Sequence, residues 1–258
     1  MKKEEFVQKP IKKLLELLDS FFNDDTTYYA ASLSFFTIFS MLPILALAIY
    51  VISSLPQFNN YIDVFLQYII EIINPTHSEQ FIEQVKNFIS NSNHLGNIGI
   101  IYMLFVFTMF FKDYEYIVNK IHKAKRKSLY ASFFFYISVL LLFPIVFALY
   151  IITISLFDST IFDYFITFLY AWLIFFGLFK LTVNRFVSNK AAFISSFITL
   201  VTLSITKNLF VYYVIYNKTY TTIYGSLATL LFFFFWIYIS WIIYLYGVKL
   251  CYQLNIKS

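Results

Sequence analysis

The chain of 258 residues has few of the residues that form a soluble surface or a chemical site. Charged residues make up 13% of it and hydrophobic residues 60%. This excludes a soluble domain, whose surface would need far more charge. The single cysteine, Cys251, provides neither a disulfide nor a pair of thiolates for a metal. With five glycines in all, the chain also has no Gly-rich loop to hold the phosphates of ATP.

Long apolar runs take up most of the chain instead. A bilayer core about 30 Å thick is crossed by about 20 apolar residues in a helix, which satisfies its own backbone groups. We therefore predict an all-α fold: a polytopic membrane helical bundle with six transmembrane helices, forming a single membrane domain over residues 1–258. The spans are predicted near 30–55, 96–111, 130–157, 162–184, 191–216 and 226–254. After the second span, apolar residues keep helical spacing as far as Ile121.

Amphipathic segments lie beside these spans. Residues 10–23 predict a helix on the cytoplasmic leaflet, because its apolar side chains fall on one face and lysines flank it. Residues 57–95 predict two amphipathic helices in the first outer loop, separated by Asn74-Pro75. These two helices either lie on the bundle or gate an outward-facing cavity.

Positive charge is concentrated on alternate loops. The N-terminal segment, the loops after the second and fourth spans and the C-terminal tail hold 16 of the 19 Lys and Arg residues. Because positive loops stay in the cytoplasm during insertion, both termini are predicted to be cytoplasmic. The net charge of +5 then indicates attraction to anionic lipid, and no nucleic-acid partner is expected.

Lys207 is the one ionisable residue plainly inside a predicted span, where it follows Ser204 and Thr206. It lies roughly 14 Å below the outer end of the fifth span. An unpaired charge at that depth costs a few kcal/mol, so Lys207 is predicted to face the bundle interior, a water-filled cavity or an anion. Two interpretations stay open: a lysine that is neutral or bonded to a carbonyl, and a contact for an anion such as a lipid phosphate.

Prolines and small residues predict how the helices pack. Pro43 and Pro144 lie inside spans, where proline removes a backbone donor and kinks the helix. Small residues at three-to-four spacing in the first and last spans predict close packing, with hydroxyls that bond between helices. The Phe-rich remainder, such as Phe232 to Phe235, is predicted to face lipid.

Several motifs resemble the YihY/virulence factor BrkB family, once labelled ribonuclease BN. Residues 29–43 resemble its opening signature, residues 119–122 its motif after the second span, and residues 224–250 its closing helix. The positions that carry this resemblance through packing are Ala30, Ala31, Ser34, Ser40, Tyr224, Gly225, Ser226, Trp236 and Gly247. The resemblance implies a virulence-associated, multi-pass protein of the bacterial cell inner (plasma) membrane, whose role in the family is poorly settled.

The residues do not support the ribonuclease label. Metal-dependent hydrolysis of a phosphodiester needs a cluster of His and carboxylate ligands. His77 and His94 are predicted outside and His122 alone inside, while Asp113 and Glu115 are interpreted as charges at headgroup level. We therefore predict no catalytic residues, no metal site and no cofactor.

The favoured function is transport or translocation of a lipid or amphiphilic anion in envelope maintenance, with membrane lipids as partners. The alternative is a non-transporting envelope scaffold, and a membrane-associated tRNA-processing ribonuclease is a remote third. A homo-oligomer and an envelope protein partner stay open.

Overall fold

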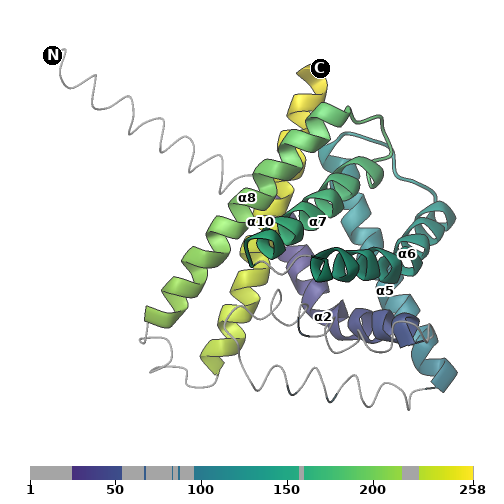
Figure 1. Cartoon of the computed structure of the whole chain (residues 1–258). Coiled ribbons are helices and arrows are strands. Elements are labelled where there is room, and N and C mark those ends of the chain that lie inside the picture. Colours follow the sequence, from purple (N-terminus) through teal and green to yellow (C-terminus); the bar gives the residue numbers. More distant parts are fainter. Residues whose placement is uncertain are drawn as a thin grey trace.

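The structure, a computed structural model, describes residues 25–53, 67, 83, 87, 96–156, 160–216 and 227–257. The amphipathic helix predicted over 10–23, nearly all of the outer segment 57–95 and the motif residues Tyr224, Gly225 and Ser226 lie outside the described residues. Six long helices fill the described ranges (Figure 1).

The all-α prediction is confirmed, and no described residue lies in a strand. Each predicted span overlaps one helix. The helices are α2 (Asp25–Ser53), α5 (Gly96–Ile121), α6 (Leu129–Ser155), α7 (Thr160–Leu181), α8 (Asn189–Tyr216) and α10 (Leu227–Lys257).

Five of these helices, α2, α6, α7, α8 and α10, are long and apolar enough to cross a membrane. The sixth, α5, runs without a break from Gly96 to Ile121, as the helical spacing beyond residue 111 predicted. Its length of about 39 Å also suffices to cross. Its second half differs from the other helices because it carries Lys112, Asp113 and Glu115. The described helices therefore fit a six-span membrane bundle.

Serine side chains start two of the helices. Ser128 Oγ accepts a hydrogen bond from Ala131 N at 3.3 Å before α6, and Ser188 Oγ accepts one from Ala191 N at 3.3 Å before α8. A serine at this position satisfies a backbone N–H that has no partner inside the helix. Both connections to the preceding helices are short, so α5 and α6, and likewise α7 and α8, are neighbours.

The last helix, α10, is the centre of the packing. It contacts α8, α2 and α5, and the remaining neighbours are α2 with α5 and α6, α5 with α6, α6 with α7, and α7 with α8. In Figure 1 α8 and α10 run side by side. The last turns of α10 lie beside the start of α8, where Ser188 N donates to Asn255 Oδ1 at 2.7 Å.

Small residues bring α8 and α10 close together. Ala192, Ser195 and Thr199 are buried on α8, and Gly247 is buried on α10. A Cβ atom built on Gly247 would lie 1.9 Å from Thr199 Oγ1. Glycine suits this crossing because the Thr199 side chain occupies the space that a Cβ atom on residue 247 would need.

The predicted hydroxyl bonds between helices are partly wrong. Ser34 Oγ donates to Ala30 O at 2.6 Å and Ser40 Oγ to Phe36 O at 2.6 Å, so both serines bond within α2. A hydroxyl deep in a helix can always reach the carbonyl of the preceding turn, which competes with a partner on another helix. The bonds between helices involve aromatic side chains, and the hydroxyl of Thr37 in the first span takes part in one of them, as predicted. Trp241 Nε1 donates to Thr37 Oγ1 at 2.8 Å, and the hydroxyls of Tyr114 and Tyr244 are hydrogen-bonded between α5 and α10.

The prediction that Phe232 to Phe235 all face lipid is also wrong. Phe232 and Phe233 are buried, whereas Phe235 is half exposed. Successive residues of a helix point about 100° apart, so four in a row cannot share one face. Phe232 packs with Phe210, Ala228 and Trp236 in a cluster between α8 and α10.

We expect Gly247→Ala to lower the thermal stability of the protein in detergent. Overpacking costs about 1–3 kcal/mol, which exceeds the roughly 1 kcal/mol that alanine gains over glycine in a helix. Gly177→Ala is the matched control, because a Cβ there meets no atom within 4 Å. The control variant should unfold at the same temperature as the natural chain or higher. Equal melting temperatures for both variants would contradict the close crossing.

Candidate functional site

One end of the bundle carries most of the described positive charge. It consists of the start of α2, the last turns of α5 and α7, the connections 122–128 and 182–188, the first turn of α8 and the last turns of α10. We call it the basic end. Its cationic residues are Lys120, Lys123, Lys125, Arg126, Lys127, Lys180, Arg185, Lys190 and Lys249.

A stripe of buried polar residues follows α5 to this end. Glu115, Asn119 and His122 are spaced by one and two helical turns and are at most 2% exposed. Residues at this spacing share one helix face. Buried polar groups are costly unless they are hydrogen-bonded, so their partners show what the stripe does. Neighbouring helices cover Glu115, so its carboxyl group is enclosed by protein, and its position at headgroup level stays a prediction.

Asn119 ties α5 to the connection between α7 and α8. Its Nδ2 donates to Glu115 O at 2.9 Å and to Thr182 O at 3.4 Å, and its Oδ1 accepts from Asn184 N at 2.7 Å. Asn184 Nδ2 in turn donates to Lys125 O at 3.0 Å, in the connection between α5 and α6. The amide side chains of Asn119 and Asn184 thus form a chain of hydrogen bonds that holds the two basic connections together.

A second asparagine holds the other side of the α7–α8 connection. Asn255, near the end of α10, accepts from Ser188 N at 2.7 Å and donates to Phe186 O at 3.0 Å. The connection is therefore fixed by side chains from α5 and α10, the two helices between which it passes.

Glu115 has one satisfied carboxyl oxygen. Oε1 accepts from Lys127 N at 3.3 Å, and Oε2 is buried without a hydrogen-bond partner. The Lys127 ammonium turns away to donate to Leu181 O at 2.9 Å. Burial lowers the pKa of Lys127, and the nearby Glu115 opposes that shift. These two opposite charges therefore influence each other without forming an ion pair.

His122 is held as a neutral ring. Its Nδ1 lies 3.1 Å from Val118 O, which can only accept, so Nδ1 carries the proton and the buried Nε2 has no partner. Burial lowers the pKa of His122, a backbone bond to Val118 opposes this, and the charge of Arg185 lowers it further. The His122 ring also lies edge-on to Tyr252 with centroids 5.7 Å apart.

A groove of about 290 Å³ lies at the basic end between α2, α5 and α10. We call it the basic groove. Three lysines, Lys120, Lys123 and Lys249, face a single carboxyl, Asp25, among its lining residues. The complete lining is Asp25, Thr26, Tyr29, Lys120, Ile121, Lys123, Lys249, Tyr252 and Gln253.

Aromatic rings and backbone geometry place two of these lysines. Lys120 Nζ lies 5.0 Å from the centroid of the Tyr29 ring, within range of a cation–π contact. Lys123 has φ of 50°, in the left-handed region that favours glycine. It ends α5 in a Schellman-type turn, with Ala124 N donating to Asn119 O at 2.9 Å and Lys123 N to Lys120 O at 3.1 Å. A lysine here costs backbone energy and adds an ammonium group to the groove.

The residues predicted from the sequence as an anion contact lie far from this groove. Lys207 is partly exposed on α8, roughly 27 Å along the helix from its start at Asn189. Ser204 Oγ donates to Leu200 O at 2.9 Å within α8, and Thr206 is partly exposed. The structure therefore does not bring Lys207 together with the basic groove.

The remaining predicted positions lie within helices. Pro43 is buried inside α2, and Pro144 lies inside α6. Their kinks stay predictions. Of the family-motif positions that are described, Ala31 is exposed, whereas the others are buried: Ala30, Ser34, Ser40, Trp236 and Gly247.

Neither the basic groove nor the stripe of buried polar residues on α5 was predicted from the sequence. The spacing of Glu115, Asn119 and His122 was visible, but an exposed helix face would show the same spacing. The groove combines residues near 25, 120 and 250, and no local pattern links them. Among the described residues no group of three or more His, Cys, Asp or Glu is placed to hold a metal ion.

Comparison with known proteins gives one family and several relatives. A family model described as "Virulence factor BrkB" matches residues 17–258. A UPF0761 membrane protein of Haemophilus influenzae is 27% identical over 239 residues, which is 88% of each chain. Another, of Pseudoalteromonas translucida, is 28% identical over 92% of this chain and 83% of the relative. A third, of Aggregatibacter aphrophilus, is 26% identical over 87% of this chain and 85% of the relative. No solved structure matches the chain significantly.

We expect Asn119→Ala to destabilise the protein by about 1–3 kcal/mol, because it leaves the N–H of Asn184 and the carbonyl of Thr182 without their partner. Thermal unfolding in detergent measures this. Asn208→Ala, at an exposed position of α8, is the control and should change stability little. A loss as small for Asn119→Ala as for the control would show that Asn119 does not hold the two connections.

The buried His122 predicts a loss of stability in mild acid. Its pKa in the folded protein lies below the ordinary 6.5, so the unfolded chain takes up the proton first as the pH falls. The stability that this group contributes is present above pH 6.5 and is lost as the pH falls below it. His122→Gln should therefore show a smaller drop in melting temperature between pH 7.5 and pH 5 than the natural chain. Identical drops would contradict a buried neutral His122.

Proposed function

The chain is an integral membrane protein of the virulence factor BrkB family, and from this premise we propose that it binds the headgroup of an anionic lipid or other amphiphilic anion in the basic groove and moves it across the membrane. The relatives reported above are described as UPF0761 membrane proteins, and these descriptions name no enzymatic activity.

The observation that carries this proposal is the composition of the basic groove. Three ammonium groups surround a cavity of about 290 Å³ that contains one carboxyl group, so the cavity attracts an anion. Tyr29 and Tyr252 supply the amphipathic rings that suit the boundary between headgroups and hydrocarbon. A phosphate with attached apolar chains fits this combination better than a hydrophilic anion.

The position of the groove favours a lipid from one leaflet. We propose that the basic end lies at the cytoplasmic face of the bacterial inner membrane, with both termini cytoplasmic, because its loops carry nearly all the Lys and Arg. The groove then opens at the level of the headgroups, where anionic lipids concentrate near clustered lysines.

Lys207 is proposed as a second contact further along the path. It lies near the buried face of α8, three residues before the buried Phe210, and no acidic residue follows Asp163 in the sequence. A charge at that depth needs an anion, water or a carbonyl. A phosphate group moving through the protein would supply that anion. Ser204 and Thr206 would add hydroxyl groups beside it.

A non-transporting scaffold is the second candidate. Its support is the exposed surface of the α7–α8 connection, where Phe186 is 82% exposed next to Arg185. An exposed aromatic beside a cation is typical of a protein contact surface.

We expect movement of fluorescent anionic phospholipid between leaflets of liposomes that contain the purified protein. Lys120→Gln/Lys123→Gln should slow it several-fold, because the groove loses two of its three ammonium groups. Lys125→Gln/Arg185→Gln is the matched control, with the same change of charge at exposed positions of the same end. Lys207→Met should slow movement too, while Lys207→Arg should preserve it.

Two results would count against transport. If folded natural protein moves no lipid, the scaffold becomes the better account. If the groove variant and its control slow movement equally, general attraction of lipid to the positive surface explains the effect, and the groove is not the binding site.

A further inference from the structure

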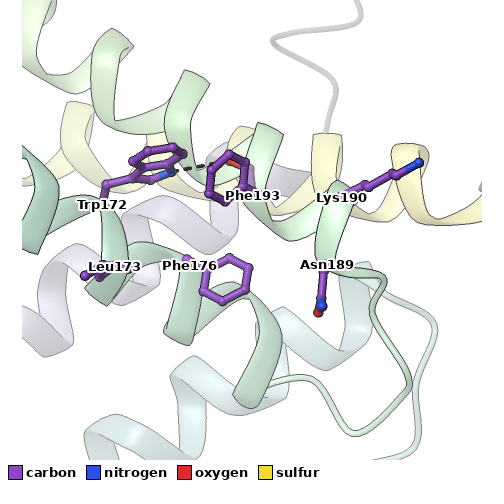
Figure 2. Close-up of a pocket in the computed structure, with 6 residues that line it drawn as sticks. All are labelled: Trp172, Leu173, Phe176, Asn189, Lys190 and Phe193. Carbon is purple, nitrogen blue, oxygen red and sulfur yellow. Dashed lines mark hydrogen bonds between the residues drawn. The ribbon is translucent and has the colours of Figure 1, made fainter.

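A second cavity, of about 380 Å³, lies between α7 and α8. Figure 2 shows its lining: Trp172, Leu173 and Phe176 from α7, and Asn189, Lys190 and Phe193 from the start of α8. We call it the aromatic slot. It lies apart from the basic groove, with which it shares no lining residue.

The walls of the slot are apolar although one of them is a tryptophan. Trp172 Nε1 donates to Phe193 O at 3.3 Å and to Ser196 Oγ at 3.1 Å, so its polar edge is satisfied by α8. The rings of Trp172 and Phe193 lie with centroids 4.2 Å apart, and Phe176 lies edge-on to Phe193 at 6.3 Å. The slot therefore offers aromatic and aliphatic carbon to an occupant.

The end of the slot nearest the α7–α8 connection is polar and positive. Lys180 Nζ is hydrogen-bonded to Asn189 Oδ1 and lies 5.9 Å from the Phe176 ring. Figure 2 shows Lys190 extending along the outside of α8, away from the aromatic rings. The sequence contains no Asp or Glu after Asp163, so no carboxylate of α7 beyond that residue or of α8 neutralises these two lysines.

The polarity of the slot matches the depth profile of a bilayer. α7 ends at Leu181, and Trp172 lies about 13 Å deeper along the helix. The slot thus runs from the level of the basic end, where the headgroups lie, into the hydrocarbon region. A phospholipid has the same arrangement, with a phosphate above and acyl chains below.

We propose that the aromatic slot binds one acyl chain of an anionic phospholipid, with the phosphate of that lipid held by Lys180 beside Asn189 and attracted by the charge of Lys190, which extends along the outside of α8. The charge decides for an anionic lipid over a zwitterionic one, because the residues that line the slot include no carboxylate to pair with a choline or ethanolamine. Binding here does not require that the protein moves lipid, so this inference is independent of the proposed transport.

Quenching of Trp172 fluorescence tests the site directly. A Trp236→Phe/Trp241→Phe background leaves Trp172 as the only tryptophan, and it is reconstituted with phosphatidylglycerol or phosphatidylcholine whose acyl chains are brominated. We expect phosphatidylglycerol to quench Trp172 at several-fold lower mole fraction than phosphatidylcholine. Lys180→Gln/Lys190→Gln should reduce this preference by roughly fivefold or more, since each lysine near anionic lipid contributes about 1 kcal/mol.

Lys120→Gln/Lys123→Gln is the matched control, because it removes the same charge from the basic groove and should leave the quenching of Trp172 unchanged. Equal quenching by the two lipids, or a preference that survives Lys180→Gln/Lys190→Gln, would overturn the proposal. If the tryptophan background fails to fold, native mass spectrometry of the natural chain replaces it. In that measurement the Lys180→Gln/Lys190→Gln variant must retain fewer phosphatidylglycerol molecules than the natural chain does. Equal retention by the two proteins would overturn the proposal.

Discussion

The cost of placing a charge in hydrocarbon governs where this bundle carries its polar groups. The described cations gather at the basic end, and the exceptions are enclosed or partly enclosed by helices, as Lys207 is on α8. Glu115 follows the same rule in another way, because α5 turns it toward its neighbours, where Lys127 N reaches one carboxyl oxygen. The basic groove therefore forms at the end that carries most of the described cations, and we propose that this end meets the lipid headgroups.

Periodicity and length were sufficient to predict the helices, because a chain in lipid has few alternatives to the helix. They predicted α5 as far as Ile121 as well, since charged residues there keep helical spacing. Which residues of each helix face lipid and which are buried was harder to predict. Phe232 and Phe233 resemble lipid-facing residues in composition, and only the packing of α10 shows that they are buried, Phe232 against Phe210 of α8 and Phe233 in the main core. Ser34 and Ser40 were expected to bond between helices, but each has a nearer acceptor in its own preceding turn.

The sites were less predictable than the fold because each depends on residues far apart in the chain. The basic groove joins Asp25, Lys120 and Lys249, and the two basic connections are linked through Asn119 and Asn184. The motif at residues 119–122 gave a partial signal: it marked Asn119 and His122, which prove to be buried and bonded. Nothing in its spacing indicated whether those residues serve packing, binding or chemistry.

The central claim is that the basic end selects anionic phospholipid. The most direct measurement is the lipid composition of the protein extracted with its native lipid annulus, compared with that of the membrane it came from. The account predicts that anionic phospholipids are enriched around the protein and that a high-salt wash reduces this enrichment only partly, because apolar contacts remain. The same proportion of anionic lipid around the protein as in the bulk membrane would contradict it.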